Sequence, residues 1–384
     1  MATRFSIVED VNSTKLIRLS KSYIGEAEKH AVMGVLERDF LGMGSDVEQF
    51  EQALTNFFGR KAICVSNGTA ALQLAFEGCN IGDGDEVLVQ SITYLASFQA
   101  ISAIRAIPVA CDIDPISLTI DLVDAEKRIT KKTKAIMPVH YSGGVGELDK
   151  VYAFAKKHGL RVIEDAAHAF GTKYKGNKIG SFGDISCFSF DGIKNITSGE
   201  GGCIVTDDPV VISKTQDSRL LGVQKDTEKR FAGKRSWDFN VSFQGWRYHM
   251  SNIMAAIGLI QLKRYTEIAK KRQNLALCYD HIFSEHKLIK TIPHNYSEVT
   301  PHIYVVRIIG MKNRDLIRDE MLKFGVQTGI HYKPNHLLSL YKKKGILSFP
   351  VTDRIYPELL SLPLHPGLSE EDINHVSKVL MELV

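Results

Sequence analysis

The sequence predicts an α/β protein, with a large domain built on a mostly parallel sheet of seven strands and a smaller C-terminal α/β domain. Two observations predict it. Short apolar strands rich in Val and Ile alternate with amphipathic helices between about residues 60 and 207, and the chain of 384 residues suits one large and one smaller domain. We expect the large domain over 1–264 and the small domain over 265–384.

The expected strands are short and apolar on both faces, which is typical of a parallel sheet covered by helices. Glycine and aspartate mark the turns between them, as in Gly82–Asp85. Helical periodicity separates several strands, over Ala70–Glu77, Leu122–Ile129 and Leu148–His158. The seven strands are expected at Lys61–Ser66, Glu86–Gln90, Pro108–Ile113, Lys134–His140, Arg161–Asp165, Ile185–Phe190 and Gly202–Thr206.

The second half of the chain has a different pattern. Residues 208–250 contain a charged stretch from Lys225 to Arg235, and we expect a long loop region there. A helical run begins near Ser251 and continues past Arg272. The expected elements of the small domain that follow are a strand at Tyr304–Ile309, a helix at Arg314–Phe324 and a C-terminal helix after Ser369.

Composition excludes several classes of protein. Hydrophobic residues make up 44% of the chain and charged residues 24%, which argues against disorder. The net charge of +4 gives no support to a nucleic-acid partner. No stretch approaches the ~18 apolar residues of a membrane span, and the N-terminus lacks a signal-peptide core, so we expect a soluble, cytoplasmic protein. The six cysteines form no CxxC pair, which indicates mostly buried, reduced thiols rather than disulfides or a zinc site.

Three features with chemical potential follow predicted strands, where open α/β sheets bind ligands. The first is the segment Ser66–Ala70, in which a strand ends, Gly68 turns the chain and a helix begins. The free N–H groups of that helix and the Thr69 hydroxyl can hold a phosphate. A simple helix N-cap is the alternative.

The second feature is the segment Arg161–His168, in which a strand delivers two acids and a histidine. Asp165 can pair with a cationic group of a ligand, or it can bind a metal or cap a helix. For a metal the ligand set is thin, because no other Cys or His cluster supports Asp165 and His168. We therefore expect no metal.

The third feature is Lys194, which lies in a glycine-flanked loop between two apolar strands, within Ser189–Gly202. Partial desolvation would lower the pKa of such a lysine and make it a nucleophile toward carbonyls, although a solvated loop lysine is the common case. Together, a phosphate cradle, an acid for a pyridinium nitrogen and a reactive lysine are what a pyridoxal phosphate site needs.

With these features the chain resembles the DegT/DnrJ family of pyridoxal phosphate-dependent nucleotide-sugar aminotransferases, which have the aspartate aminotransferase fold. The block around Lys194 with Gly199–Gly202 is the most specific part. The resemblance runs nearly end to end and also includes Gly42–Glu51, Tyr248–Asn252 with Ala255 and Ala256, Gly329–His336 and Leu360–Leu364.

The resemblance implies roles for individual residues. Lys194 would bind pyridoxal 5'-phosphate covalently and shuttle the proton, and Asp165 would pair with the pyridinium nitrogen. Plain alternatives exist for three others: Tyr94 as a core aromatic, Ser189 as a turn cap and His168 as a structural histidine. The further cofactor-binding residues it implies are Gly68, Thr69, Ala70 and Ser189 at the phosphate, Tyr94 stacked on the ring, His168 beside it, and Arg247.

The implied reaction has two stages. An amino acid, typically L-glutamate, gives its amine to the cofactor, and the nitrogen then passes to a nucleotide-linked keto sugar. We expect amination at C4 of dTDP-4-keto-6-deoxy-D-glucose for O-antigen (lipopolysaccharide) or another surface polysaccharide. Alternatives are a C3 aminotransferase, a dehydratase, against which Lys194 argues, and a regulator without turnover. The candidate substrate-binding residues are His331, Tyr332, Lys225, Lys229 and Arg230, although a charged loop is usually only solvated.

Two segments depart from the family pattern. Many members carry Asn and Arg where this chain has Arg247 and His249, and that Asn usually reaches the cofactor phosphate of the other subunit. We still expect a homodimer with shared active sites, and no nucleic-acid or membrane partner. The second departure is Asp191–Gly192, where bulkier or aromatic residues are common.

Overall fold

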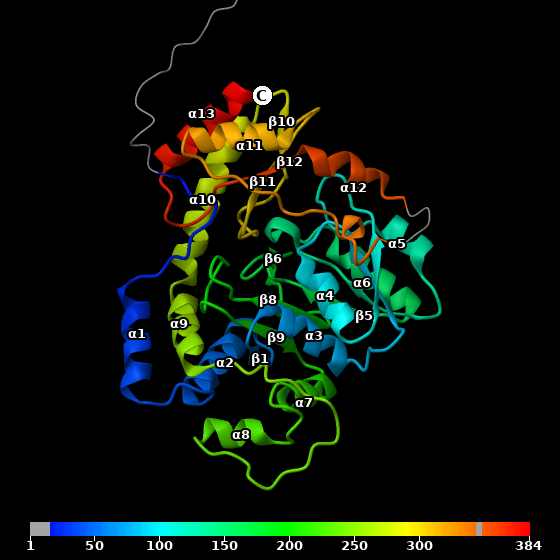
Figure 1. The fold of residues 1–384 in the computed structure, drawn as a ribbon, viewed down its shortest axis with the longest axis vertical. Coiled ribbons are helices and arrows are strands. Elements are labelled where there is room, and N and C mark those ends of the chain that lie inside the picture. The colour runs from blue at the N-terminus through cyan, green and yellow to red at the C-terminus, as the bar shows by residue number, and fades with distance from the viewer. Residues whose placement is uncertain (1–15, 343–347) are drawn as a thin grey trace, which may run out of the picture.

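The computed structural model describes residues 16–342 and 348–384 (Figure 1). Its centre is a seven-stranded sheet in which one strand, β9, runs antiparallel to both neighbours while the other neighbouring pairs are parallel. The predicted, mostly parallel sheet is therefore confirmed. In order across the sheet, the strands are β1 (Ala62–Val65), β9 (Gly202–Thr206), β8 (Ile185–Ser189), β5 (Arg161–Asp165), β4 (Thr133–Met137), β2 (Glu86–Gln90) and β3 (Ile107–Cys111).

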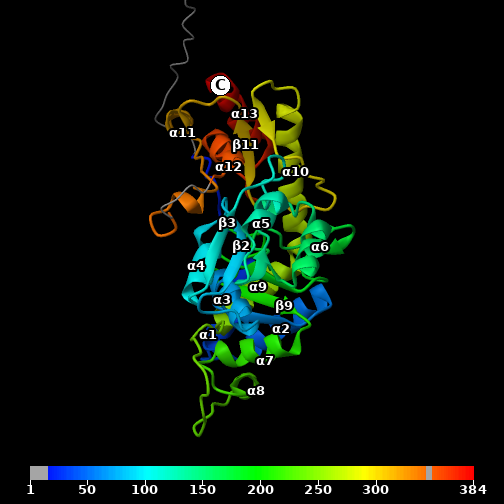
Figure 2. The ribbon, with the colours of Figure 1, turned by 90° about the vertical axis from the view of Figure 1, so that its right-hand side faces the viewer.

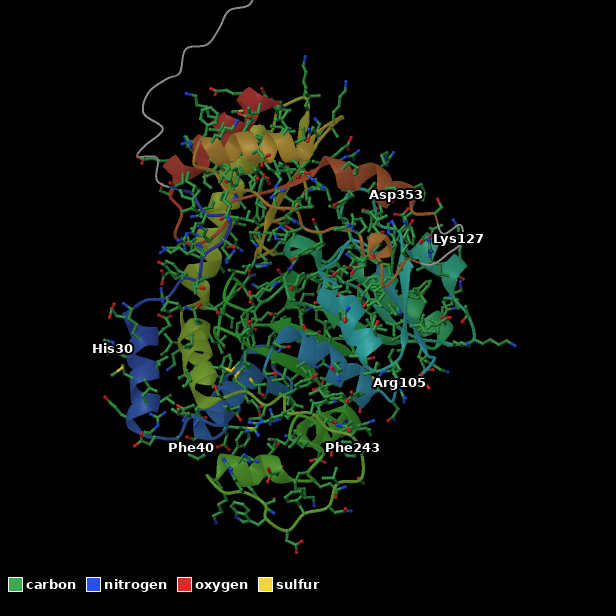
Figure 3. All side chains as sticks on the ribbon, viewed as in Figure 1. His30, Phe40, Arg105, Lys127, Phe243 and Asp353 are labelled. Atoms are coloured by element: carbon green, nitrogen blue, oxygen red, sulfur yellow. The ribbon has the colours of Figure 1, made fainter. Side chains whose placement is uncertain are left out.

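Two hydrophobic clusters cover the two faces of the sheet. Strand residues alternate between them, so that Leu88 belongs to one cluster while Val87 and Val89 belong to the other. Side chains fill the layers between sheet and helices (Figure 3). The first cluster includes residues of α2 (Ser45–Phe58), α5 (Leu122–Arg128) and α6 (Leu148–His158), and the second includes residues of α3 (Gly68–Gly78), α4 (Leu95–Ala103) and α7 (Pro209–Ser218).

The expectation of a long loop over residues 208–250 is wrong for two stretches, which form α7 and α8 (Asp226–Phe231). Asp208 caps α7 by accepting hydrogen bonds from the N–H groups of Val210 (2.9 Å) and Val211 (3.3 Å). In α8, Arg230 pairs with Asp226 one turn earlier, over 2.8 Å. The charged residues of this segment therefore support a short helix.

The helical run predicted from Ser251 is divided at Arg264 into α9 (Asn252–Lys263) and α10 (Tyr265–Phe283). Arg264 Nη1 and Gln261 Nε2 both donate to the buried carboxylate of Glu28, over 2.7 and 2.8 Å. Because Glu28 belongs to α1 (Glu26–Glu37), these bonds fix α1 beside α9, as Figure 1 shows.

A second sheet of three antiparallel strands has its own hydrophobic core and lies above the large sheet in Figure 2. We propose that this core marks the small domain, with its boundary at residue 265. Ile17 also packs in this core, and its N–H donates to the carbonyl of Gly325 over 2.8 Å. The elements are β10 (Ile289–Thr291), β11 (Tyr304–Ile308), β12 (Leu359–Leu362), α10, α11 (Arg314–Lys323) and α13 (Glu370–Leu383).

The remaining elements are small. A hairpin of β6 (Lys173–Tyr174) and β7 (Asn177–Lys178) follows β5, and α12 (Pro350–Ile355) precedes β12. All six cysteines are free, and four of them are buried. Within residues 16–342 and 348–384, no helix is both long enough and apolar enough to span a membrane.

Candidate active site

A pocket of about 500 Å³ lies where the parallel strands of the large sheet end. Residues that end or follow β1, β2, β5 and β8 line it, among them Gly68, Tyr94, Asp165 and Lys194. The carboxyl ends of parallel strands meet at one edge of a sheet, so segments far apart in sequence converge there. The small domain completes the lining with His302, His331 and Tyr332.

Asp165 is the last residue of β5 and is only 5% exposed. Its Oδ2 accepts a hydrogen bond from Ser97 Oγ over 2.6 Å, and its Oδ1 accepts one from the N–H of Ala167 over 3.2 Å. Ser97 Oγ also lies 2.8 Å from Thr93 Oγ1. The carboxylate is therefore fixed in orientation, and it lines the pocket.

Lys194 extends from the loop after β8 into the same pocket. Its Nζ lies 3.2 Å from Nε2 of His302. Burial lowers the pKa of the Lys194 amine to about 8; the nearby carboxylates of Asp165 and Asp191 oppose this effect, and Arg272 adds to it. An amine with this pKa is unprotonated in a substantial fraction of molecules near neutral pH, so it can act as a nucleophile or a base.

The segment after β1 forms the helix N-cap that was the alternative for Ser66–Ala70, and part of it also lines the pocket. Asn67 caps α3, because its Oδ1 accepts the N–H of Ala70 over 2.8 Å. That N–H is thus engaged, and the Ala70 side chain lies in the hydrophobic core, whereas Gly68 and Thr69 line the pocket. A Cβ on Gly68 would lie 2.8 Å from Cβ of Ser189, so only glycine fits this close approach.

Aromatic and imidazole rings form one wall of the pocket. Tyr94 is 58% exposed and therefore is no core aromatic, and its ring centroid lies 5.5 Å from that of Tyr332. Tyr332 Oη lies 3.0 Å from Nε2 of the buried His168. Nδ1 of His168 is buried and has no hydrogen-bond partner among the described residues. His331 Nδ1 lies 2.7 Å from Ser361 Oγ, which fixes its ring.

The four predicted cations, Lys225, Lys229, Arg230 and Arg247, do not reach the pocket of their own chain. Arg247 is exposed. Lys229 Nζ donates to Ser236 Oγ over 2.9 Å, and Arg230 pairs with Asp226. Lys225 immediately precedes α8, which lies at the lower end of the molecule in Figure 1; Phe243, labelled in Figure 3, also lies toward that end.

Ser97, His302 and Glu200 are among the site residues that the sequence prediction does not include. Thr93 precedes α4 and Ser97 lies in its first turn, so no motif of the sequence marks their contact. His302 precedes β11 in an otherwise apolar segment, and nothing in its sequence surroundings marks it.

The comparisons with known proteins agree with this geometry. Residues 22–381 match the model of the DegT/DnrJ/EryC1/StrS aminotransferase family. The chain belongs to this family. A curated relative of this aminotransferase, the spore coat polysaccharide biosynthesis protein SpsC of Bacillus subtilis, is 36% identical over 371 residues, which cover 94% of this chain and 95% of that protein.

Solved structures extend the comparison. The putative sugar aminotransferase Spr1654 from Streptococcus pneumoniae superposes in its apo form with a TM-score of 0.89 at 31% identity, over 96% of this chain and 97% of that chain. Its PLP form gives a TM-score of 0.88 at 30% identity, over 96% and 100%. PseC of Helicobacter pylori, an aminotransferase involved in the biosynthesis of pseudoaminic acid, gives 0.89 at 28% identity, over 96% and 99%. The predicted fold, enzyme class and cofactor are confirmed.

The residues of this pocket fit pyridoxal 5'-phosphate. The cradle at Gly68, which a Cβ would fill, lies at the N-terminus of α3 and suits a phosphate. The fixed carboxylate of Asp165 suits a protonated ring nitrogen, and the Lys194 amine suits the cofactor's carbonyl carbon. The aminotransferase therefore presents each of the three groups that this cofactor requires.

Proposed function

We propose that this aminotransferase uses pyridoxal 5'-phosphate, held at Lys194, to move an amino group from L-glutamate to a nucleotide-linked keto sugar. One observation carries the proposal: the Lys194 amine, the Asp165 carboxylate and the Gly68 cradle line a single pocket. When bound, the cofactor withdraws electrons from the carbon that carries the nitrogen. The chain's own residues supply binding, orientation and proton transfer.

Lys194 is the group proposed to move the proton. Its Nζ takes a proton from the nitrogen-bearing carbon of the donor and returns a proton to the sugar carbon in the second stage. A pKa of about 8 keeps both protonation states populated near neutral pH, as a residue that acts in turn as base and acid requires. Asp165, whose orientation Ser97 fixes, would keep the ring nitrogen protonated.

The phosphate would be held by Gly68 and Thr69 at the start of α3, with the Ser189 hydroxyl beside them. Ser189 Oγ accepts only a long hydrogen bond, 3.4 Å, from the N–H of Asp191, so it keeps capacity for a ligand. Tyr94 is exposed at the pocket wall and would stack on the ring, while His168 would lie beside it. His331 and Tyr332 would contact the substrate.

The charges of the pocket support a homodimer. Asp165, Asp191 and Glu200 line it, whereas Lys194 is the one lysine or arginine among its described lining residues. The cofactor phosphate, glutamate and a nucleotide diphosphate are all anionic, so a single chain lacks the cations to balance them. We propose that a second subunit supplies Arg247, and that Lys225, Lys229 and Arg230 serve the nucleotide.

Mixed dimers test the shared site. Chains with Lys194→Ala and chains with Arg247→Ala should each show low activity alone. If the site is shared, mixing them restores activity, because some mixed dimers carry one site with both residues intact. Mixing that restores nothing, in samples shown to exchange subunits, would contradict the shared site.

The sugar substrate is the finer part of the proposal. We propose C4 of dTDP-4-keto-6-deoxy-D-glucose as the acceptor and a surface polysaccharide, such as O-antigen, as the destination. The relation to a spore coat polysaccharide biosynthesis protein and to an aminotransferase of pseudoaminic acid biosynthesis supports a surface sugar. The test supplies L-glutamate with a panel of 4-keto and 3-keto sugar nucleotides and locates the new amine by NMR. Amination only at C3 would overturn the C4 assignment.

A further inference from the structure

The ε-amine of Lys194 makes one hydrogen bond within the part of the chain that the structure describes. Its partner is Nε2 of His302, at 3.2 Å. His302 is 3% exposed and lies in the small domain, two residues before the start of β11. The small domain therefore reaches the reactive atom of a lysine that the large domain carries.

The backbone of His302 is fixed by hydrogen bonds on both sides, and His168 packs against its ring. Its N–H donates to the carbonyl of Ser142 over 3.2 Å, and its carbonyl accepts from Arg272 Nη1 over 3.0 Å. Its ring centroid lies 4.4 Å from that of His168. These contacts place the ring of His302 with Nε2 toward the Lys194 amine.

Arg272 links this histidine to the lysine loop. Nη2 of Arg272 donates to the carbonyls of Ile193 (3.2 Å) and Lys194 (3.5 Å), while Nη1 donates to those of His302 (3.0 Å) and Leu364 (3.3 Å). Arg272 as a whole is 2% exposed. One buried group thus fixes the separation of the two backbones that carry Lys194 and His302.

The imidazole of His302 is the hydrogen-bond acceptor in this pair. Burial, and next the neighbouring Lys194, hold the pKa of His302 well below its ordinary value, so its ring is neutral. The ammonium form of Lys194 has only donors, and Nε2 must therefore accept. The ring proton then lies on Nδ1, which has no hydrogen-bond partner among the described residues.

We infer that His302 is a positioning residue that receives the ε-ammonium of Lys194 whenever the lysine carries a proton, and holds it at a fixed place in the pocket. This inference rests on the proposed function, because it assigns a place to the proton that Lys194 moves. His302 takes no proton itself: the N–H bond formed on Lys194 persists until the proton is delivered. The contact stabilises the charged amine through a hydrogen bond to an ionised group.

Other groups face the same amine and must be kept constant in a test. They come from the large sheet, the lysine loop, α10 and the small domain, and they are Asp165, His168, Asp191, Glu200, Arg272, His331 and Tyr332. Of these, Asp165 and Asp191 favour the ammonium form, and Arg272 disfavours it.

The experiment measures the pKa of Lys194 in the full-length apo protein, from the pH dependence of its acetylation rate read by mass spectrometry. In His302→Leu the pKa should fall by about one unit, because the ammonium loses a charge-assisted hydrogen bond. His302→Gln, whose amide oxygen can accept, should restore most of the shift. His294→Leu removes another largely buried histidine away from this pocket and should leave the value unchanged.

An unchanged Lys194 pKa in folded His302→Leu protein would overturn the inference. If His302→Leu does not fold, the test is 15N NMR of the histidine rings. It compares wild-type protein with Lys194→Met, both labelled at histidine. One ring with unprotonated Nε2 should shift between the two proteins, and no such ring would again overturn the inference. Neither readout needs a substrate, so each is independent of the proposed function. The role of His302 can be refuted while L-glutamate still aminates the cofactor. Equally, the role of His302 can be supported while the proposed function fails.

Discussion

Ser97 Oγ donates a hydrogen bond to Oδ2 of Asp165 over 2.6 Å, which joins the first turn of α4 to the end of β5. The carboxylate thereby presents a defined edge to the pocket. A hydrogen bond to an ionised carboxylate contributes about 1.5–3 kcal/mol. Ser97 is therefore expected to matter for the electrostatics of the bound cofactor, although it follows no motif of the sequence.

Removing this hydrogen bond should slow the reaction. Ser97→Ala is expected to lower kcat about tenfold or more, because ~1.4 kcal/mol corresponds to a factor of ten. Ser102→Ala serves as the control, since Ser102 lies in the same helix and bonds to the carbonyl of Phe98 over 3.0 Å. Steady-state kinetics with L-glutamate measure the effect. Equal rates for the two variants would show that Asp165 needs no such support.

The cradle at Gly68 should not tolerate a side chain. Gly68→Ala places a Cβ 2.8 Å from Cβ of Ser189, so the loop must shift, and the affinity for pyridoxal 5'-phosphate should fall at least tenfold. Gly34→Ala is the matched control, because that glycine lies within α1, where a Cβ would meet only the side chain of Arg38 at an ordinary contact distance of 3.5 Å. This variant should be neutral or more stable by about 0.5–1 kcal/mol. Titration of the apo proteins with cofactor measures both. Unaltered affinity in Gly68→Ala would place the phosphate elsewhere.

The rate at which the apo protein captures the cofactor should depend on pH through Lys194. Only the unprotonated amine attacks a carbonyl, and burial lowers its pKa to about 8 from an ordinary value of 10.5. The rate should rise about tenfold per pH unit below pH 8 and level off above it. Stopped-flow absorbance between pH 6 and 10 gives the profile. A rate that still rises tenfold per pH unit up to pH 10 would show that the amine is solvated.

Asn335 holds the segment that carries Tyr94. Its Nδ2 donates to the carbonyls of Ser91 (3.2 Å) and Thr93 (2.9 Å), and it is 1% exposed. Asn335→Ala leaves these carbonyls without that donor and should cost about 1–3 kcal/mol in free energy of unfolding. The exposed Asn274→Ala should stay within about 0.5 kcal/mol. Denaturant unfolding compares the two, and equal stabilities would refute the role of Asn335.

The sequence predicts the large sheet closely because its strands are apolar on both faces. Arg161–Asp165 and Gly202–Thr206 match the structure to the residue. Helix α8 escapes prediction because it is short and charged. Helix α7 escapes it although the pair Asp208–Pro209 is a helix-start signal.

The residues of the candidate site also differ in how far the sequence predicts them. Lys194 and Asp165 follow strands, so their convergence is foreseeable from the topology of the sheet. His302 comes from the small domain, whose docking no local pattern encodes. Arg247 lies outside the pocket of its own chain, so the fold of one chain does not bring it to the site.

The most direct test of the central claim is the absorption spectrum of the purified protein with its cofactor, before and after L-glutamate is added. The account predicts that the absorbance of covalently held pyridoxal phosphate is replaced by that of the aminated cofactor, with one 2-oxoglutarate released per site. Lys194→Ala should not hold the cofactor covalently, whereas exposed Lys156→Ala should behave as wild type. A protein that shows no cofactor absorbance even with added pyridoxal 5'-phosphate, or whose absorbance no amino acid alters, would contradict it.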